Sequence, residues 1–237
     1  MINNELMLNS GSVLYYILPT IALAITSFAQ LLITSNYGKY KKIAAASKKR
    51  GCDVARQILD KHGLKNVNVE QVEGNLTDHY DPKTKTVRLS TDIYGESTIA
   101  AVSVAAHECG HAIQDKVGYA PMRIRSKLVP VVNFSTKIGY FIITAGLVMG
   151  ALKLAGIGLI MLLSMLVFQL VTLPVEFDAS RRGKRELNSL MILDSNEQTG
   201  ASKMLRAAAF TYVASVLSTL MEILRFAAMI LTNRKRK

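Results

Sequence analysis

Long apolar runs separated by basic and polar segments dominate the chain. The first run, residues 13–33, is long enough to cross a hydrocarbon layer about 30 Å thick as a helix. The second, residues 129–173, is too long for one crossing and predicts a helical hairpin that turns within residues 150–156. The last, residues 207–231, predicts either a fourth transmembrane helix or a re-entrant helix. This pattern predicts a mainly α integral membrane protein.

The positive charge indicates how the chain is oriented in the membrane. Much of the net charge of +12 comes from Lys and Arg residues beside the apolar runs, and such residues favour the cytoplasmic side. We therefore expect a multi-pass plasma-membrane protein with two cytoplasmic polar regions, residues 37–128 and 174–206, and with Lys153 outside. No Lys or Arg precedes the first run, which indicates an uncleaved anchor rather than a signal peptide. The basic tail, residues 232–237, would lie outside after a fourth crossing and inside after a re-entrant helix.

The first polar region, residues 37–128, combines helix and strand patterns. Residues 44–62 have the period of a basic amphipathic helix, and an alternating strand pattern follows. Residues 76–80 and 86–89 flank residues 81–84, whose Asp-Pro-Lys-Thr sequence is typical of a hairpin turn. The pattern predicts a small α+β domain with a short β-hairpin.

One motif in this region can carry chemistry: His107-Glu108-Cys109-Gly110-His111. It lies within residues 97–117, which we expect to form a helix with Ser97 as its N-cap. Residues four apart share one helix face, so both imidazoles can bind one metal ion. Zinc lowers the pKa of a bound water to roughly 7, and a carboxylate beside it can take the proton as the water attacks a carbonyl. The motif therefore predicts a zinc hydrolase with Glu108 as general base, rather than a helix with two solvated histidines.

A third ligand is required, because a catalytic zinc takes three protein ligands and leaves one position for water. Glu176 is the expected ligand, since it follows the hairpin and so returns to the membrane face from which the two histidines project. Pro174 fits the first turn of a new helix there, with Thr172 as its cap. Acidic residues at such a place also suit a helix N-terminus that binds no metal. Asp178 is the nearest rival ligand, or it holds an imidazole N–H from outside the ligand set.

The motif, together with Val175-Glu176-Phe177-Asp178-Ala179-Ser180-Arg181-Arg182, resembles the YugP-type family of bacterial membrane zinc metallopeptidases. Residues 119–126 and 205–212 are similar to that family too, and the likeness covers nearly the whole chain from Tyr37 onward. More distantly, the layout is similar to HtpX-type and prenyl-protein (CAAX) proteases, in which an Asp lies four residues after the Glu ligand. Here Ser180 stands at that position. The resemblance implies a gluzincin-like peptidase with His107, His111 and Glu176 as ligands and Glu108 as base.

Together these features predict a zinc endopeptidase that acts on membrane or membrane-proximal polypeptides from the cytoplasmic side. The alternative is a non-catalytic scaffold or assembly protein with a vestigial metal site. Glu108 argues against it, because a structural zinc needs no base and normally has four protein ligands. No nucleic-acid partner is expected, since the basic residues lie at membrane edges without a groove-reading motif. A homo-oligomer or membrane partner proteins are compatible with the sequence, and Cys52 and Cys109 imply no disulfide framework.

Overall fold

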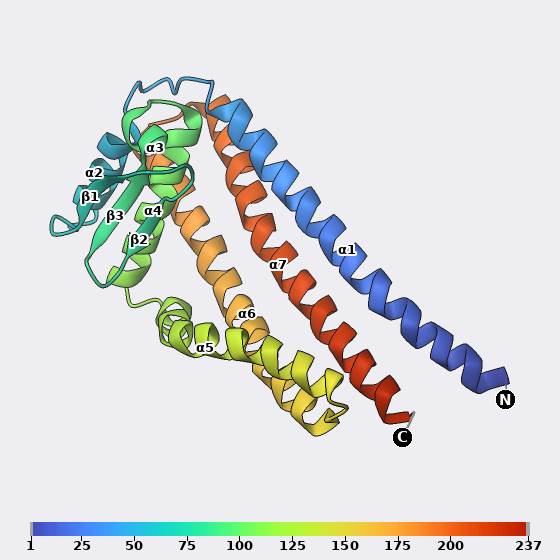
Figure 1. The fold of residues 1–237 in the computed structure, drawn as a ribbon. Coiled ribbons are helices and arrows are strands. Elements are labelled where there is room, and N and C mark those ends of the chain that lie inside the picture. The colour runs from blue at the N-terminus through green and yellow to red at the C-terminus, as the bar shows by residue number, and fades with distance from the viewer. Residues whose placement is uncertain (1, 236–237) are drawn as a thin grey trace. The chain divides into compact units, whose positions relative to one another are not determined.

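The computed structural model describes the backbone of residues 2–235 and the side chains of residues 13–234. Contacts divide the chain into two compact units. Unit 1 holds the described parts of Met1–Gln30, Ile124–Thr172 and Thr211–Lys237, and unit 2 holds Leu31–Arg123 and Leu173–Phe210. Of the basic tail expected at residues 232–237, residues 236 and 237 lie outside the described part. The elements are α1 (Ile2–Tyr40), α2 (Gly51–Lys61), β1 (Asn68–Val72), β2 (His79–Asp81), β3 (Thr86–Ser90), α3 (Thr91–Gly95), α4 (Ile99–Lys116), α5 (Ala120–Val148), α6 (Leu152–Ser189) and α7 (Ser195–Lys235) (Figure 1).

Unit 1 consists of apolar parts of the four longest helices. Among the described residues, α1, α5, α6 and α7 are each long and apolar enough to cross a membrane, by length and composition. Unit 2 adds a small sheet with shorter helices. The expected fold class, a mainly α membrane protein with a small α+β domain, is therefore confirmed.

The connection between α5 and α6 is tighter than the sequence suggested. The turn expected within residues 150–156 occupies residues 149–151, where Gly150 has a φ of +65°. Next to this turn the two helices pack closely, because a β-carbon on Gly146 would lie 2.4 Å from the backbone nitrogen of Ala155. Small residues of this kind allow close helix packing in membranes.

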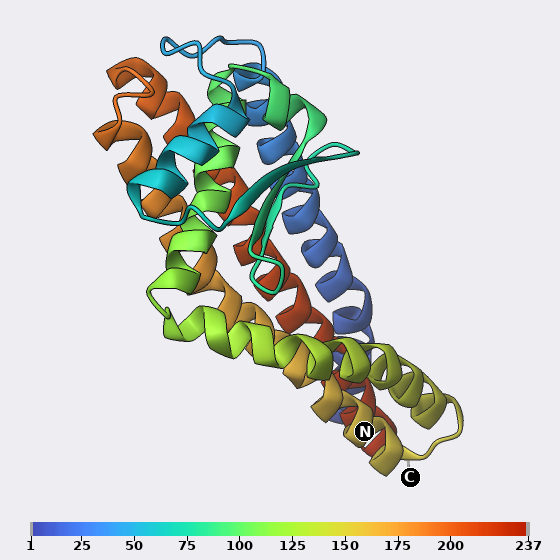
Figure 2. The same ribbon diagram turned by 90° about the vertical axis from the view of Figure 1, so that its left-hand side faces the viewer.

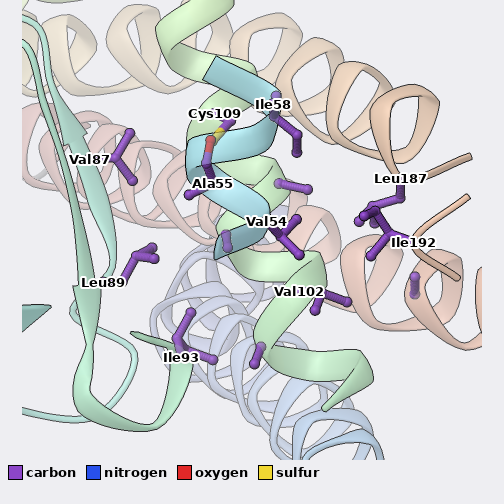
Figure 3. Close-up of a cluster of buried hydrophobic side chains, with 14 of the residues drawn as sticks. Val54, Ala55, Ile58, Val87, Leu89, Ile93, Val102, Cys109, Leu187 and Ile192 are labelled. Atoms are coloured by element: carbon purple, nitrogen blue, oxygen red, sulfur yellow. The ribbon is translucent and has the colours of Figure 1, made fainter. Parts of the chain in front are cut away.

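Unit 2 is built around α4, with α2 and the three strands beside it (Figure 2). The strand order is β1-β3-β2; β1 runs parallel to β3, and β2 runs antiparallel to it. The β2–β3 pair is the hairpin that the sequence predicted. The buried Val87 and Leu89 project from β3 toward the helices, while Leu187 and Ile192 approach from the other side (Figure 3). Helix α4 therefore runs through the middle of this core.

Helix α2 starts at Gly51, later than the expected start at residue 44. Residues 43–45 are used instead for an extended pairing with the segment before α4, in which Ala45 donates its N–H to the Ser97 carbonyl. The helix starts at Ile99, so Ser97 lies one residue too early to cap it. Thr98 does so, and its side chain accepts a backbone N–H from the first turn at 3.2 Å. Tertiary pairing thus overrides the local helix pattern.

Helix α6 continues through Pro174, so the expectation of a new helix there with Thr172 as cap is wrong. The Thr172 hydroxyl donates to the Phe168 carbonyl at 2.8 Å, a bond made within the helix. An interior proline removes one backbone hydrogen bond, but long helices with packed neighbours tolerate it. Here Val175 is fully buried and its carbonyl accepts from Gln114 of α4 at 2.8 Å, which holds the turn that follows the proline.

Helix α7 begins at Ser195, just after Asp194, which caps it. The Asp194 carboxylate accepts from the N–H groups of Asn196 and Glu197, both at 2.8 Å. The Glu197 carboxylate in turn accepts from the Asp194 N–H at 2.8 Å, which completes a capping box. Further along the helix, Glu222 and Arg225 form the ion pair that their spacing of three residues predicts.

Candidate metal centre

Helix α4 presents both histidines of the motif to one side. The imidazole rings of His107 and His111 lie edge to face, with centroids 4.8 Å apart, as a spacing of four residues predicts. Glu108 and His111 are buried. Cys109 is fully buried on another side of the helix, with its Sγ 3.5 Å from the Ala55 carbonyl oxygen of α2. The motif thus separates a packing face from a face that can hold a metal.

Glu176 of α6 lies against both imidazoles. Its Oε2 is 3.3 Å from His107 Nε2 and 3.6 Å from His111 Nε2. The possible ligand atoms of the three residues all lie within 4.8 Å of one another. Ligand atoms about 2.0–2.2 Å from a tetrahedral zinc are roughly 3.3–3.6 Å apart. The two separations from Glu176 match such edges, and the three side chains form a group that could hold a metal ion.

Two glycines allow α4 and α6 to approach closely enough for this. A β-carbon on Gly110 would lie 2.5 Å from the carbonyl oxygen of Ala179 in α6. Likewise, a β-carbon on Gly183 would lie 2.8 Å from the carbonyl oxygen of Ala106 in α4. Each helix thus meets the backbone of the other at a glycine, and this contact sets how far Glu176 must reach.

The second nitrogen of each imidazole is held by a polar side chain. His107 Nδ1 is 3.1 Å from Ser180 Oγ, and His111 Nδ1 is 3.0 Å from Gln114 Oε1. With the Nδ1 atoms engaged, both Nε2 atoms are directed toward Glu176. The sequence prediction did not include Gln114, although its place three residues after His111 on the same helix could have indicated the contact.

Asp178 contacts neither imidazole, which corrects the expectation that it holds an imidazole N–H. Its Oδ2 accepts from Gln114 Nε2 at 3.0 Å and from Arg182 Nε at 2.6 Å, and its Oδ1 accepts from Arg181. The reason is geometric: two residues along a helix turn by about 200°, so Asp178 and Glu176 cannot face the same point. The Asp178 carboxylate reaches His111 only through Gln114.

Known proteins resemble this chain over most of its length. A family model described as "Putative neutral zinc metallopeptidase" matches residues 15–231. The chain belongs to this family. A curated relative from Bacillus subtilis (strain 168), described as "Putative membrane protease YugP", is 44% identical over 221 residues, which cover 93% of this chain and 98% of the relative. No solved structure matches the chain significantly.

Membership in the neutral zinc metallopeptidase family confirms the resemblance seen in the sequence. The family description supports a proteolytic function in general and implies zinc as the metal. The His107, His111 and Glu176 cluster is a group of side chains that could hold it. The relative's description and the four apolar helices fit a membrane location.

In this member of the zinc metallopeptidase family, Glu108 lies in a buried environment next to the cluster. Burial raises the pKa of Glu108 to about 7; the neighbouring His107 opposes the rise, and the Glu176 carboxylate adds to it. A hydrogen bond with the Tyr80 backbone also lowers the pKa, which shows that β2 lies beside this carboxyl group. A carboxylate whose pKa is raised toward neutrality is a stronger proton acceptor than an exposed one.

Proposed function

We propose that this chain is an integral-membrane zinc endopeptidase whose active site faces the cytoplasm. The proposal rests on one observation: His107, His111 and Glu176 converge from two helices, with Glu176 Oε2 3.3 Å and 3.6 Å from the two Nε2 atoms. Imidazole and carboxylate are ligands that zinc prefers, and these separations fit the edges of a tetrahedral site. Three protein ligands leave one position open, as catalytic rather than structural zinc sites do.

In this proposal His107, His111 and Glu176 would hold the ion, and Glu108 would move the proton. When bound, zinc supplies Lewis-acid activation of water and of the scissile carbonyl. Glu108 accepts the proton of the attacking water and can pass it to the leaving amine. Its position next to His107 in sequence, on a different side of α4, keeps it beside the ligands without adding a fourth one. A scaffold protein would have no use for such a base.

The sheet offers a place for an extended polypeptide substrate. Within the described part of the chain, β2 is an edge strand that pairs with β3 alone. An open strand edge can pair with a peptide backbone. Because the Tyr80 backbone in β2 hydrogen-bonds with Glu108, a peptide along this edge would pass the proposed base. This supports a polypeptide as substrate, in line with the family description.

The charge pattern supports a cytoplasmic site. Each of the four apolar helices suits a membrane crossing, and α7 is unbroken through residues 207–231, which favours a fourth crossing over a re-entrant helix. With four crossings, the turn at residues 149–151 lies outside, and the basic segments after α1 and around Arg181 lie inside. We expect substrates that are membrane proteins or lie near the membrane.

Metal analysis combined with proteolysis tests the proposal. The purified full-length chain should hold one zinc ion and cleave an unfolded protein, and a chelator should abolish both properties. His107→Ala or His111→Ala should lose zinc and activity. His62→Ala is the matched control, since His62 pairs with Glu186 away from the cluster. Stoichiometric zinc in either ligand variant would overturn the ligand assignment, and zinc without proteolysis would support the scaffold alternative.

A further inference from the structure

The side chain of Gln114 is fully buried and makes three polar contacts. Its Oε1 lies 3.0 Å from His111 Nδ1. Its Nε2 donates to the Val175 carbonyl at 2.8 Å and to Asp178 Oδ2 at 3.0 Å. One amide on α4 therefore connects a histidine of the motif to both the backbone and a carboxylate of α6.

These contacts allow only one orientation of the amide. Both neighbours of Nε2 are acceptors: a backbone carbonyl, and a carboxylate that is kept ionised by Arg181 and Arg182. A flipped amide would place its oxygen against these two acceptor oxygens and leave its two N–H groups without them. The amide oxygen must therefore face His111, and because that oxygen can only accept, Nδ1 of His111 must donate.

The orientation of the amide fixes the tautomer of the histidine. A neutral imidazole carries one proton, so a proton held on Nδ1 leaves the lone pair on Nε2. That is the nitrogen 3.6 Å from Glu176 Oε2. We infer that Gln114 is a positioning residue: with its amide oriented by Asp178, it holds the proton of His111 on Nδ1 and so presents Nε2 to the metal. This inference rests on the proposed function and deepens it.

Because the neutral amide of Gln114 lies between His111 and the carboxylate of Asp178, the amide and the carboxylate can be exchanged between positions 114 and 178 by mutation. Gln114→Glu places a second carboxylate against Asp178, where only a donor fits, so the network should break. Adding Asp178→Asn to that variant supplies an amide donor and moves the single negative charge one position toward His111. The pair of changes keeps the number of charges and restores the donor–acceptor matches that link residue 178 through residue 114 to His111, while the Val175 carbonyl and Arg182 each lose a partner. A role in packing alone gives no reason for rescue.

The test measures zinc affinity of the full-length chain by competition with a chelator. We expect Gln114→Leu to weaken affinity on the order of 10–100-fold, as is typical when the partner of a ligating histidine is lost. Gln114→Glu keeps an oxygen beside His111 but should also weaken affinity, because its second carboxylate oxygen is repelled by Asp178. The Gln114→Glu, Asp178→Asn double variant should bind zinc more tightly than Gln114→Glu, but less tightly than the wild type, because the Val175 carbonyl and Arg182 lose their partners. Ser103→Ala is the matched control: Ser103 is buried in α4 and donates to Ile99 O at 2.6 Å, so this variant should bind zinc normally.

A second measurement reports on the proton itself. The chain has 4 His residues, so ¹⁵N labelling of histidine gives a simple spectrum. In the zinc-loaded protein, the Nδ1 proton of His111 should be protected from solvent exchange, and Gln114→Leu should lose that protection. If the purified wild-type protein bound no zinc, the proposed function would be wrong. Two other results would overturn only the role of Gln114, provided that the wild type binds zinc. In the first, Gln114→Glu binds zinc as tightly as the wild type; in the second, the double variant binds zinc no more tightly than Gln114→Glu. Both results can be obtained even if Gln114→Leu fails to fold.

Discussion

Gly110 of α4 lies directly against Ala179 of α6: a β-carbon at position 110 would come within 2.5 Å of the Ala179 carbonyl oxygen. This contact holds the two helices at the separation at which Glu176 reaches both histidines. The separation of α4 and α6 therefore determines the distances between Glu176 and the two histidines, and a change in that separation should alter those distances.

Gly110→Ala should push α6 away from α4. We expect a loss of stability of about 1–3 kcal/mol, as for other overpacked sites, together with weaker zinc affinity. Gly156→Ala is the matched control, because Gly156 lies within α6 and has nothing within 4 Å of the added carbon; alanine's higher helix propensity should leave its stability equal or higher. Thermal unfolding and chelator competition measure both effects. Normal zinc affinity in Gly110→Ala would show that the helix separation does not limit binding.

Glu108→Gln should separate metal binding from chemistry. The amide is nearly isosteric with the carboxyl group, so the fold and the zinc content should be kept. The base is lost, however, and turnover should fall by at least the roughly 10²–10⁴-fold that is typical of general-base loss. Activity on an unfolded protein, measured beside zinc content, checks this. Unchanged activity would mean that Glu108 is not the base.

Part of this arrangement is readable from local sequence. The spacing of His107 and His111 fixes their shared face once α4 is a helix, and chain order alone indicated Glu176, because the hairpin had to return. Pro174 was misread for a physical reason: its local signal favours a helix start, but the buried Val175 and its bond with Gln114 keep α6 continuous.

The network around the imidazoles could not be read in the same way. The role of Gln114 depends on the Val175 carbonyl and on Asp178, which only packing brings near. The partner of His107, Ser180, comes from α6 in the same way. Long-range contacts of this kind leave no periodic pattern in the sequence. Asp178 therefore lies near the imidazoles, as expected, but contacts Gln114 instead of a histidine.

Cysteine labelling in membrane vesicles tests the proposed topology. Both native cysteines are buried, so their background reaction should be low. Cysteines at the exposed positions 48 and 185 should react only with a membrane-permeant reagent, whereas one at position 153 should react with an impermeant reagent from outside. Position 234 reports on α7: labelling from outside supports a fourth crossing. Labelling of positions 48 and 153 from the same side would refute the hairpin.

The ranking of the two carboxylates on α6 is the sharpest check on the cluster. Glu176 Oε2 lies beside both Nε2 atoms, so Glu176→Gln should weaken zinc affinity severely, because a neutral amide is a poor zinc ligand. Asp178 acts only through Gln114, so Asp178→Asn should cost less, on the order of 10–100-fold.

Glu186→Gln provides the control for loss of a buried carboxylate from the same helix, since Glu186 pairs with Lys61 and His62 instead. It should leave zinc affinity unchanged while lowering stability, because Lys61 and His62 lose their partner. If Asp178 proved essential for zinc and Glu176 dispensable, the wrong carboxylate would have been assigned. Asp178 would then be the third ligand beside the two histidines. If neither carboxylate mattered for zinc affinity, only two histidines on one helix would remain, which is too few ligands for the catalytic site proposed for this chain.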